Sequence, residues 1–224
     1  MQESLDTVLR MFQRGGPVMW PLLAISIVSL ALTLERLVYV WKGRRPDTPG
    51  ALARATAALG RADVAEARDA AEHAGPLYHR ATRRLTADPR DRTSATAAIA
   101  VETGRAEAER FLPVLSVIVT AAPLLGILGT VLGIIKSFDV VAEAPGPVEL
   151  KDVAAGIAEA LLTTAAGMVI ALLALLPYAL LRSWAGRAVT SIEVLAEAWA
   201  APASPTSSPD APAPASTTAG PPAD

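Results

Sequence analysis

Three long runs of uncharged, mainly apolar residues constrain this chain more than any other feature. They are residues 18–34 (17 residues), 111–135 (25 residues) and 160–181 (22 residues). A helix needs about 20 apolar residues to cross the roughly 30 Å hydrocarbon core of a bilayer. The second and third runs are long enough, and the first qualifies if its helix continues past Glu35 and Arg36, which can pair or snorkel. The sequence predicts an all-α integral membrane protein with three transmembrane helices.

Two alternatives explain one or more of these runs. The first run resembles the core of a cleaved signal peptide, with Arg10 and Arg14 as its basic region. Against this, the run is longer than a typical signal core, and Glu35 and Arg36 stand where a cleavage site would be. A buried helical hairpin in a soluble protein is the alternative for the other two runs, and uncharged stretches of 22 and 25 residues disfavour it.

The basic residues predict the orientation. Residues 42–110 carry 13 Lys and Arg, whereas 1–17 and 136–152 carry two each. The positive-inside rule therefore places 42–110 and the C-terminus in the cytoplasm. Three spans with a periplasmic N-terminus satisfy this arrangement.

The soluble parts differ in composition. Residues 42–110 are rich in Ala, Arg and Glu and predict two or more cytoplasmic helices. No breaker lies between Ala106 and Leu112, so we expect the last of these helices to run into the second membrane helix, with Pro113 as a kink. The tail is mostly Pro, Ala, Ser and Thr, which predicts disorder.

The predicted organisation follows from these segments in chain order. It comprises a periplasmic N-terminus (1–17), transmembrane helix one (18–41), a cytoplasmic helical region (42–110), transmembrane helix two (111–135), a periplasmic loop (136–152), transmembrane helix three (153–181), a cytoplasmic helix end (182–200) and a disordered tail (201–224). The long membrane helices are expected to extend into the cytoplasmic helical region.

Composition and motifs argue against several function classes. The formal net charge is -2, which disfavours nucleic acid as a partner. There is no cysteine, and His73 and His79 form no metal motif. The chain contains no nucleophile elbow, HExxH or P-loop. We therefore expect no enzyme activity, no cofactor and no metal.

Glu159 is the acidic residue that is most informative about function, because it lies inside the predicted third transmembrane helix. If the third helix starts near Val153, Glu159 lies about 9–10 Å along it. A carboxylate at that depth is expected to face a bundle interior or a wet cavity. An interfacial acid that only marks the helix start, where the dipole favours it, is the open alternative.

Small and hydroxylated residues recur at spacings of three and four in the last two runs. They are Thr120, Pro123, Gly126, Thr130, Gly133 and Ser137 in one, and Ala160, Thr164, Gly167, Ala171 and Ala174 in the other. Such stripes let membrane helices approach closely. The hydroxyls of Thr130, Thr163 and Thr164 either line a polar path or bond back to their own helix.

Two motifs resemble the signatures of a known family. Residues 122–138 (APLLGILGTVLGIIKSF) and 156–167 (GIAEALLTTAAG) are similar to the two signatures of the MotA/TolQ/ExbB proton channel family. Residues 15–22 and 35–37 resemble its N-terminal part. Three helices with the soluble region between the first and second resemble ExbB and TolQ rather than the four-helix MotA proteins, and the motifs do not separate ExbB from TolQ.

The resemblance implies a function and partners. Such proteins form homo-oligomers, expected here to be pentamers, in the bacterial inner membrane around an ExbD/TolR-like single-span protein whose aspartate carries protons. The motion driven by the proton motive force is passed to a TonB- or TolA-like protein that spans the periplasm, in transport or envelope maintenance. Membrane lipid is a further partner. A non-conducting oligomeric membrane scaffold is the alternative.

The resemblance also assigns residues by motif position. Thr130, Thr164 and Glu159 match the ion-path positions of the family, and Thr163, where many relatives have a small apolar residue, adjoins them. Residues assigned to helix packing are Gly126, Gly133, Gly167 and Pro123.

Overall fold

The protein is all-helical in the part of the chain that the structure describes. The computed structural model describes residues 15–43, 47–144, 146 and 149–202, which contain seven helices and no strand. The helices are α2 (Met19–Gly43), α3 (Thr48–Gly60), α4 (Val64–Ala74), α5 (Pro76–Leu85), α6 (Ser94–Ala108), α7 (Leu112–Glu143) and α8 (Leu150–Ala200). Of these, α2, α7 and α8 are long and apolar enough to cross a membrane. The predicted all-α membrane protein with three spanning helices is confirmed. Most of the N-terminal segment and the tail from residue 203 onward lie outside the described residues.

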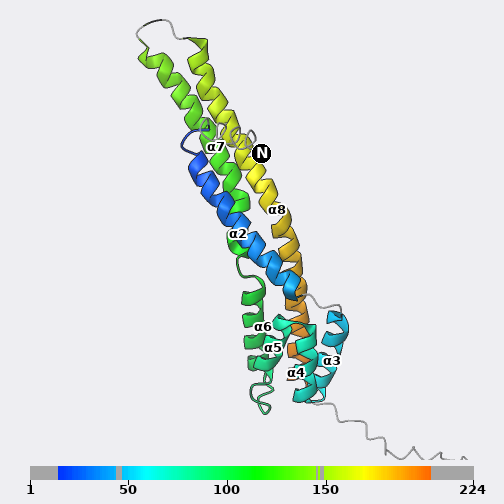
Figure 1. The fold of residues 1–224 in the computed structure, drawn as a ribbon. Helices are drawn as coiled ribbons and strands as arrows, with labels where there is room; N and C mark the ends of the chain where they lie inside the picture. Colours follow the sequence, from blue (N-terminus) through cyan, green and yellow to red (C-terminus); the bar gives the residue numbers. More distant parts are fainter. Residues whose placement is uncertain (1–14, 44–46, 145, 147–148, 203–224) are drawn as a thin grey trace, which may run out of the picture.

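The α7–α8 hairpin is the longest part of the molecule. α8 has 51 residues, which at 1.5 Å per residue is about 77 Å, more than twice the thickness of a bilayer core. α2 lies along the middle of the hairpin, and the hairpin tip extends beyond the start of α2 (Figure 1). The C-terminal part of α8 continues into a bundle with α3, α4, α5 and α6 (Figure 1). α8 therefore joins the two ends of the molecule without interruption.

Alanines form most of the core of this bundle. Ala55 on α3, Ala67 on α4 and Ala100 on α6 are buried together with Leu195 and Trp199 of α8. The small side chains let the short helices approach α8 closely, and the large Trp199 ring fills the space between them. The bundle is thus assembled around the end of α8.

Arg92 closes the C-terminal end of α8. Its Nε donates to the carbonyl of Trp199 at 2.7 Å, and Nη2 donates to that of Ala201 at 2.8 Å. Its guanidinium also lies 4.8 Å from the centre of the Trp199 ring. The last carbonyls of a helix have no partner within the helix, so a cation here both satisfies them and complements the helix dipole.

The turn that carries Arg92 is itself fixed by hydrogen bonds. The Asp91 carboxylate accepts from the hydroxyls of Thr96 at 2.5 Å and Thr93 at 2.8 Å, and these bonds hold the pKa of Asp91 below its usual value. The Thr93 hydroxyl caps α6 by accepting from the amide of Thr96 at 3.3 Å. Trp199 Nε1 donates to the carbonyl of Asp91 at 3.2 Å. The start of α6 is therefore fastened to the end of α8.

We predict that Arg92→Ala destabilises the bundle by about 2 kcal/mol, because it removes charged hydrogen bonds to partly buried carbonyls. Thermal unfolding of the purified protein in detergent measures the effect. Arg90→Ala, an exposed arginine of the same turn, is the matched control and is expected to leave the midpoint unchanged. Equal midpoints for the two variants would contradict the capping role.

The expected continuous helix from residues 42–110 into the second membrane helix is wrong. α6 ends at Ala108, α7 begins at Leu112, and Phe111 between them has a left-handed backbone with φ 72°. Pro113 explains the break, because it has no N–H to donate to the carbonyl of Glu109 and its fixed φ suits the first turn of a helix. Pro113 therefore lies in the first turn of a new helix instead of kinking an old one.

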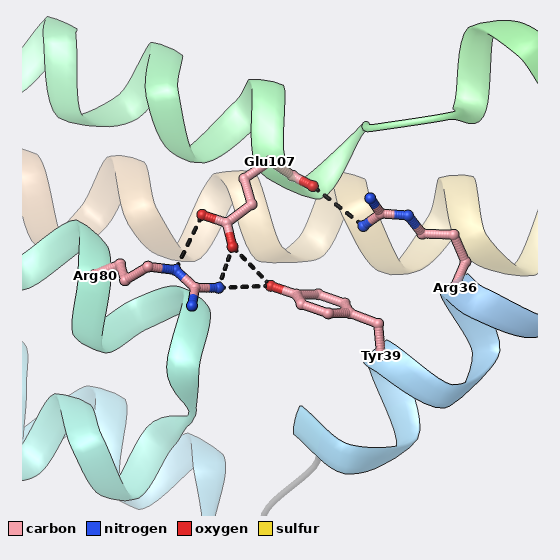
Figure 2. A network of polar contacts seen from close by, with 4 residues as sticks. All are labelled: Arg36, Tyr39, Arg80 and Glu107. Atoms are coloured by element: carbon pink, nitrogen blue, oxygen red, sulfur yellow. Dashed lines mark hydrogen bonds and ion pairs between the residues drawn. The ribbon is translucent and has the colours of Figure 1, made fainter. Parts of the chain in front are cut away.

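Arg36 of α2 compensates for this break. It is 3% exposed, and its Nη1 donates to the carbonyl of Glu107 at 3.3 Å (Figure 2). In an unbroken helix that carbonyl would accept from the amide of Phe111. The Arg36 guanidinium also lies 5.0 Å from the centre of the Phe111 ring and within 3.1 Å of the Glu35 carboxylate. The buried arginine thus stabilises the non-helical joint.

The Glu107 carboxylate joins three helices at the same point. It accepts from the hydroxyl of Tyr39 (α2) at 2.9 Å and from Nε of Arg80 (α5) at 3.1 Å (Figure 2). Arg80 Nη2 pairs with the same carboxylate and donates to the Tyr39 hydroxyl at 3.0 Å. This network ties the end of membrane helix α2 to the bundle.

We predict that Glu107→Ala lowers stability by about 1 kcal/mol, because the network is partly exposed and solvent screens it. Glu102→Ala is the matched control on the same helix, since the Glu102 side chain is 78% exposed. Limited proteolysis at the α6–α7 joint measures the local effect. Identical cleavage rates in the two variants would show that the network does not hold the joint.

Candidate functional site

Glycines bring α7 and α8 into backbone contact along a seam. A Cβ added to Gly167 would lie 2.5 Å from the carbonyl oxygen of Ala122, and one on Gly126 would lie 3.0 Å from Cα of Thr164. Gly133 is enclosed in the same way farther along the seam. Real Cβ atoms do not approach backbone as closely as at Gly167 and Gly133, so a side chain there would push the helices apart, and one at Gly126 would be tightly packed.

Pro123 lies in the same stretch of α7 and is partly buried. It has no N–H, so the carbonyl of Val119 does not receive its usual helical hydrogen bond. Buried Ala122 and Gly126 flank it on the side that faces α8. The structure therefore places all four residues assigned to helix packing in or beside the seam.

Thr164 is the threonine that crosses the seam. Its hydroxyl donates to the carbonyl of Gly126 on α7 at 2.8 Å. The short separation that Gly126 permits brings the hydroxyl within reach of that carbonyl. The bond links the two helices at the Gly126 contact.

The other two threonines bond within their own helices. Thr130 donates to the carbonyl of Ile127 at 2.6 Å, and Thr163 donates to that of Ala160 at 2.8 Å. Thr163 is 1% exposed, whereas Thr130 is partly exposed on α7. Among the described residues, none of the three hydroxyls bonds to the Glu159 carboxylate.

Glu159 lies deeper in its helix than the sequence indicated. α8 begins at Leu150 rather than near Val153, so Glu159 is nine residues beyond the helix start, about 13–14 Å along the axis. The helix dipole favours an acid only within the first turn. The position therefore disfavours the alternative in which Glu159 merely marks a helix start.

The Glu159 carboxylate pairs with a lysine of the opposite helix. Lys136 Nζ of α7 lies 2.7 Å from Glu159 Oε2. Sequence reasoning did not single out Lys136. The sequence signal is that Lys136 directly follows the second apolar run and Glu159 directly precedes the third. An antiparallel hairpin therefore places the two charges at similar depth.

Ser137 holds the seam together next to this pair. Its hydroxyl lies 3.0 Å from the carbonyl of Gly133 on its own helix and 3.1 Å from that of Val153 on α8. Across the described part of the chain, no group of three or more His, Asp or Glu side chains is arranged to hold a metal ion. The polar chemistry of the described α7–α8 seam is thus hydroxyl, backbone carbonyl and the Lys136–Glu159 ion pair.

These features define a three-span helical membrane protein with polar groups inside a tightly packed hairpin. Comparison with protein families matches residues 70–194, more than half of the chain, to the MotA/TolQ/ExbB proton channel family. The chain belongs to this family, and the resemblance noted in its two signature motifs is confirmed.

Individual relatives agree with the family match. The chain is 37% identical over 181 residues to the putative biopolymer transport protein ExbB-like 1 of Synechocystis, covering 77% of this chain and 69% of the relative. It is 32% identical over 196 residues to the biopolymer transport protein exbB1 of Vibrio cholerae, covering 84% and 85%. A putative ExbB homolog of Methanothermobacter thermautotrophicus is 27% identical over 194 residues, covering 84% and 68%.

We predict that Gly167→Ala costs about 1–3 kcal/mol, because the added methyl group must push α7 away from α8. Gly186→Ala is the matched control on the same helix, since a Cβ there meets nothing within 4 Å. It is expected to be neutral or stabilising, as alanine favours helix. Thermal unfolding in detergent compares the two, and similar midpoints would contradict backbone contact at the seam.

Proposed function

We propose that this chain is an ExbB/TolQ-like subunit of an inner-membrane proton-channel motor. The motor uses the proton motive force to energise a TonB- or TolA-like protein that spans the periplasm. Membership of the proton channel family over all of α7 and most of α8 is the observation that carries this proposal. Relatives named as ExbB-type biopolymer transport proteins, which align over most of this chain, support it. The role is that of a channel subunit rather than an enzyme.

The proposed topology places the bundle in the cytoplasm and the hairpin tip in the periplasm. Thirteen Lys and Arg in residues 42–110 support this orientation. The segment before α2 is then periplasmic, and the end of α8 is cytoplasmic. In this arrangement the Arg36–Glu107 contact lies where the first membrane span meets the cytoplasmic bundle.

The proposed ion path uses Thr130, Thr163, Thr164 and Glu159. One elementary charge that crosses the membrane releases about 2.3 kcal/mol per 100 mV, which is the energy available for motion. This chain contributes hydroxyls and one carboxylate to the membrane interior and no mid-membrane aspartate. We therefore propose that an ExbD/TolR-like single-span partner supplies the main proton carrier within a ring, a pentamer, of this chain.

A non-conducting membrane scaffold is a second candidate. The observation that favours it is that all three threonine hydroxyls donate to backbone carbonyls, as they would in purely structural positions. The two candidates differ in what hydroxyl removal does. A scaffold loses only stability, whereas a channel loses ion flux while it stays assembled.

We predict that Thr130→Val, Thr164→Val and Glu159→Ala each reduce proton-driven coupling without abolishing assembly. Valine keeps the shape of threonine but has no hydroxyl to offer to a passing ion. Proton uptake into vesicles that contain the chain and its single-span partner measures flux, and size-exclusion chromatography measures assembly. Thr164→Ser, which keeps the hydroxyl, is the control. Wild-type flux in all three variants would refute the assignment of these residues to the ion path, whereas a non-conducting scaffold would give no flux even in the wild-type protein.

A further inference from the structure

The Glu159 carboxylate is enclosed in a membrane-spanning helix. Its side chain is 14% exposed, and an ionised carboxylate taken out of water requires a compensating charge. Lys136 is the cation within ion-pair distance of it among the described residues. Thr163, the adjacent hydroxyl, bonds to the carbonyls of Ala160 and Glu159 and not to the carboxylate. Lys136 alone therefore balances this charge within the described chain.

The other carboxylate oxygen is covered by backbone. Gly16, in the segment before α2, has a left-handed conformation with φ 69°, and a Cβ on it would overlap Glu159 Oε1. Neighbouring Gly15 is buried in the same way against Met19. A side chain at position 16 is thus strained by the backbone conformation, and its Cβ would displace the Glu159 carboxylate. In the glycine segment (residues 15–16), Gly16 packs against Oε1, while Lys136 pairs with Oε2.

The two partners differ in their freedom to move. The Lys136 side chain is 64% exposed and reaches Glu159 with the end of a flexible stem, whereas Glu159 is enclosed between α7, α8 and the glycine segment. Withdrawal of the ammonium requires only rotation about side-chain bonds. The Glu159 side chain is 14% exposed and packs against Gly16, so it has less free space in which to rotate.

We infer that Lys136 is a positioning residue for Glu159 and a counter-ion that the transported cation replaces. At rest the Lys136 ammonium neutralises the carboxylate and, with Gly16, fixes its place at the end of the seam. When the ammonium swings away, an arriving cation takes over the charge balance at Glu159. This inference rests on the proposed function and names the residue that controls access to one of its ion-path groups.

A double-mutant cycle on the full-length purified chain tests the pairing. Lys136→Met leaves a buried carboxylate without its counter-charge, and we expect the thermal midpoint to fall by about 5 °C. The double variant Lys136→Met/Glu159→Gln removes both charges and is expected to regain most of that loss. Lys136→Arg keeps the charge and is expected to behave like wild type. Additive effects of the two single changes would overturn the inference.

Matched controls separate this pairing from general damage. Lys151→Met removes an 83% exposed lysine of the same hairpin and is expected to change nothing. Gly16→Ala is expected to displace the carboxylate and lower the midpoint, whereas Gly60→Ala, where a Cβ meets nothing within 4 Å, is not. Equal midpoints for the two glycine variants would contradict the packing of Gly16 against Glu159 Oε1.

Cation flux into vesicles is the second readout, measured with the single-span partner at a temperature where every variant is folded. We expect several-fold lower flux for folded Lys136→Met, which a purely structural role would not produce, and wild-type flux for Lys136→Arg, which keeps the charge. Wild-type flux in Lys136→Met would overturn the inference. Wild-type flux in Glu159→Gln, combined with a coupled stability cycle, would support the Lys136–Glu159 ion pair but exclude Glu159 from the ion path. Failure of the pairing and failure of the proposed ion path are therefore distinguishable.

Discussion

The rest of the structure depends on backbone contact between α7 and α8. In a bilayer the hydrophobic effect does not drive two apolar helices together, so their association depends on close packing and hydrogen bonds. Gly126 and Gly167 allow the axes to approach until Thr164 can bond to a carbonyl of the opposite helix. The same register places Lys136 against Glu159. Larger residues at Gly126 and Gly167 would separate the helices and break these polar contacts.

The two long helices meet the bundle in different ways. α8 continues without a break from the hairpin tip to Trp199, where Arg92 closes it. α7 begins just after a left-handed residue, Phe111, and is joined to α6 by a short non-helical segment that Arg36 supports from α2. α8 is therefore continuous with the bundle, whereas α7 is connected to it through the non-helical joint.

The spans and the family were predictable from sequence, and much of the local geometry was not. The three apolar runs are enough to predict the spans, because bilayer thickness sets the length that a spanning helix needs. The sequence predicts a kink at Pro113 rather than the break at Phe111, although the missing N–H of Pro113 equally permits a position in the first turn of a helix. The Lys136–Glu159 pair was missed because it depends on the register of two helices that are separated by a loop. Propensity describes each helix alone and carries no information on register.

The central claim is that this chain surrounds a single-span partner in a proton-driven motor. The most direct measurement is the mass of the complex that co-purifies in mild detergent when the chain is expressed with an ExbD/TolR-like single-span protein. We predict one species that contains several copies of this chain and the partner together. A homo-oligomer that never retains the partner would contradict the motor and leave a membrane scaffold, with Thr130 and Thr164 as packing residues.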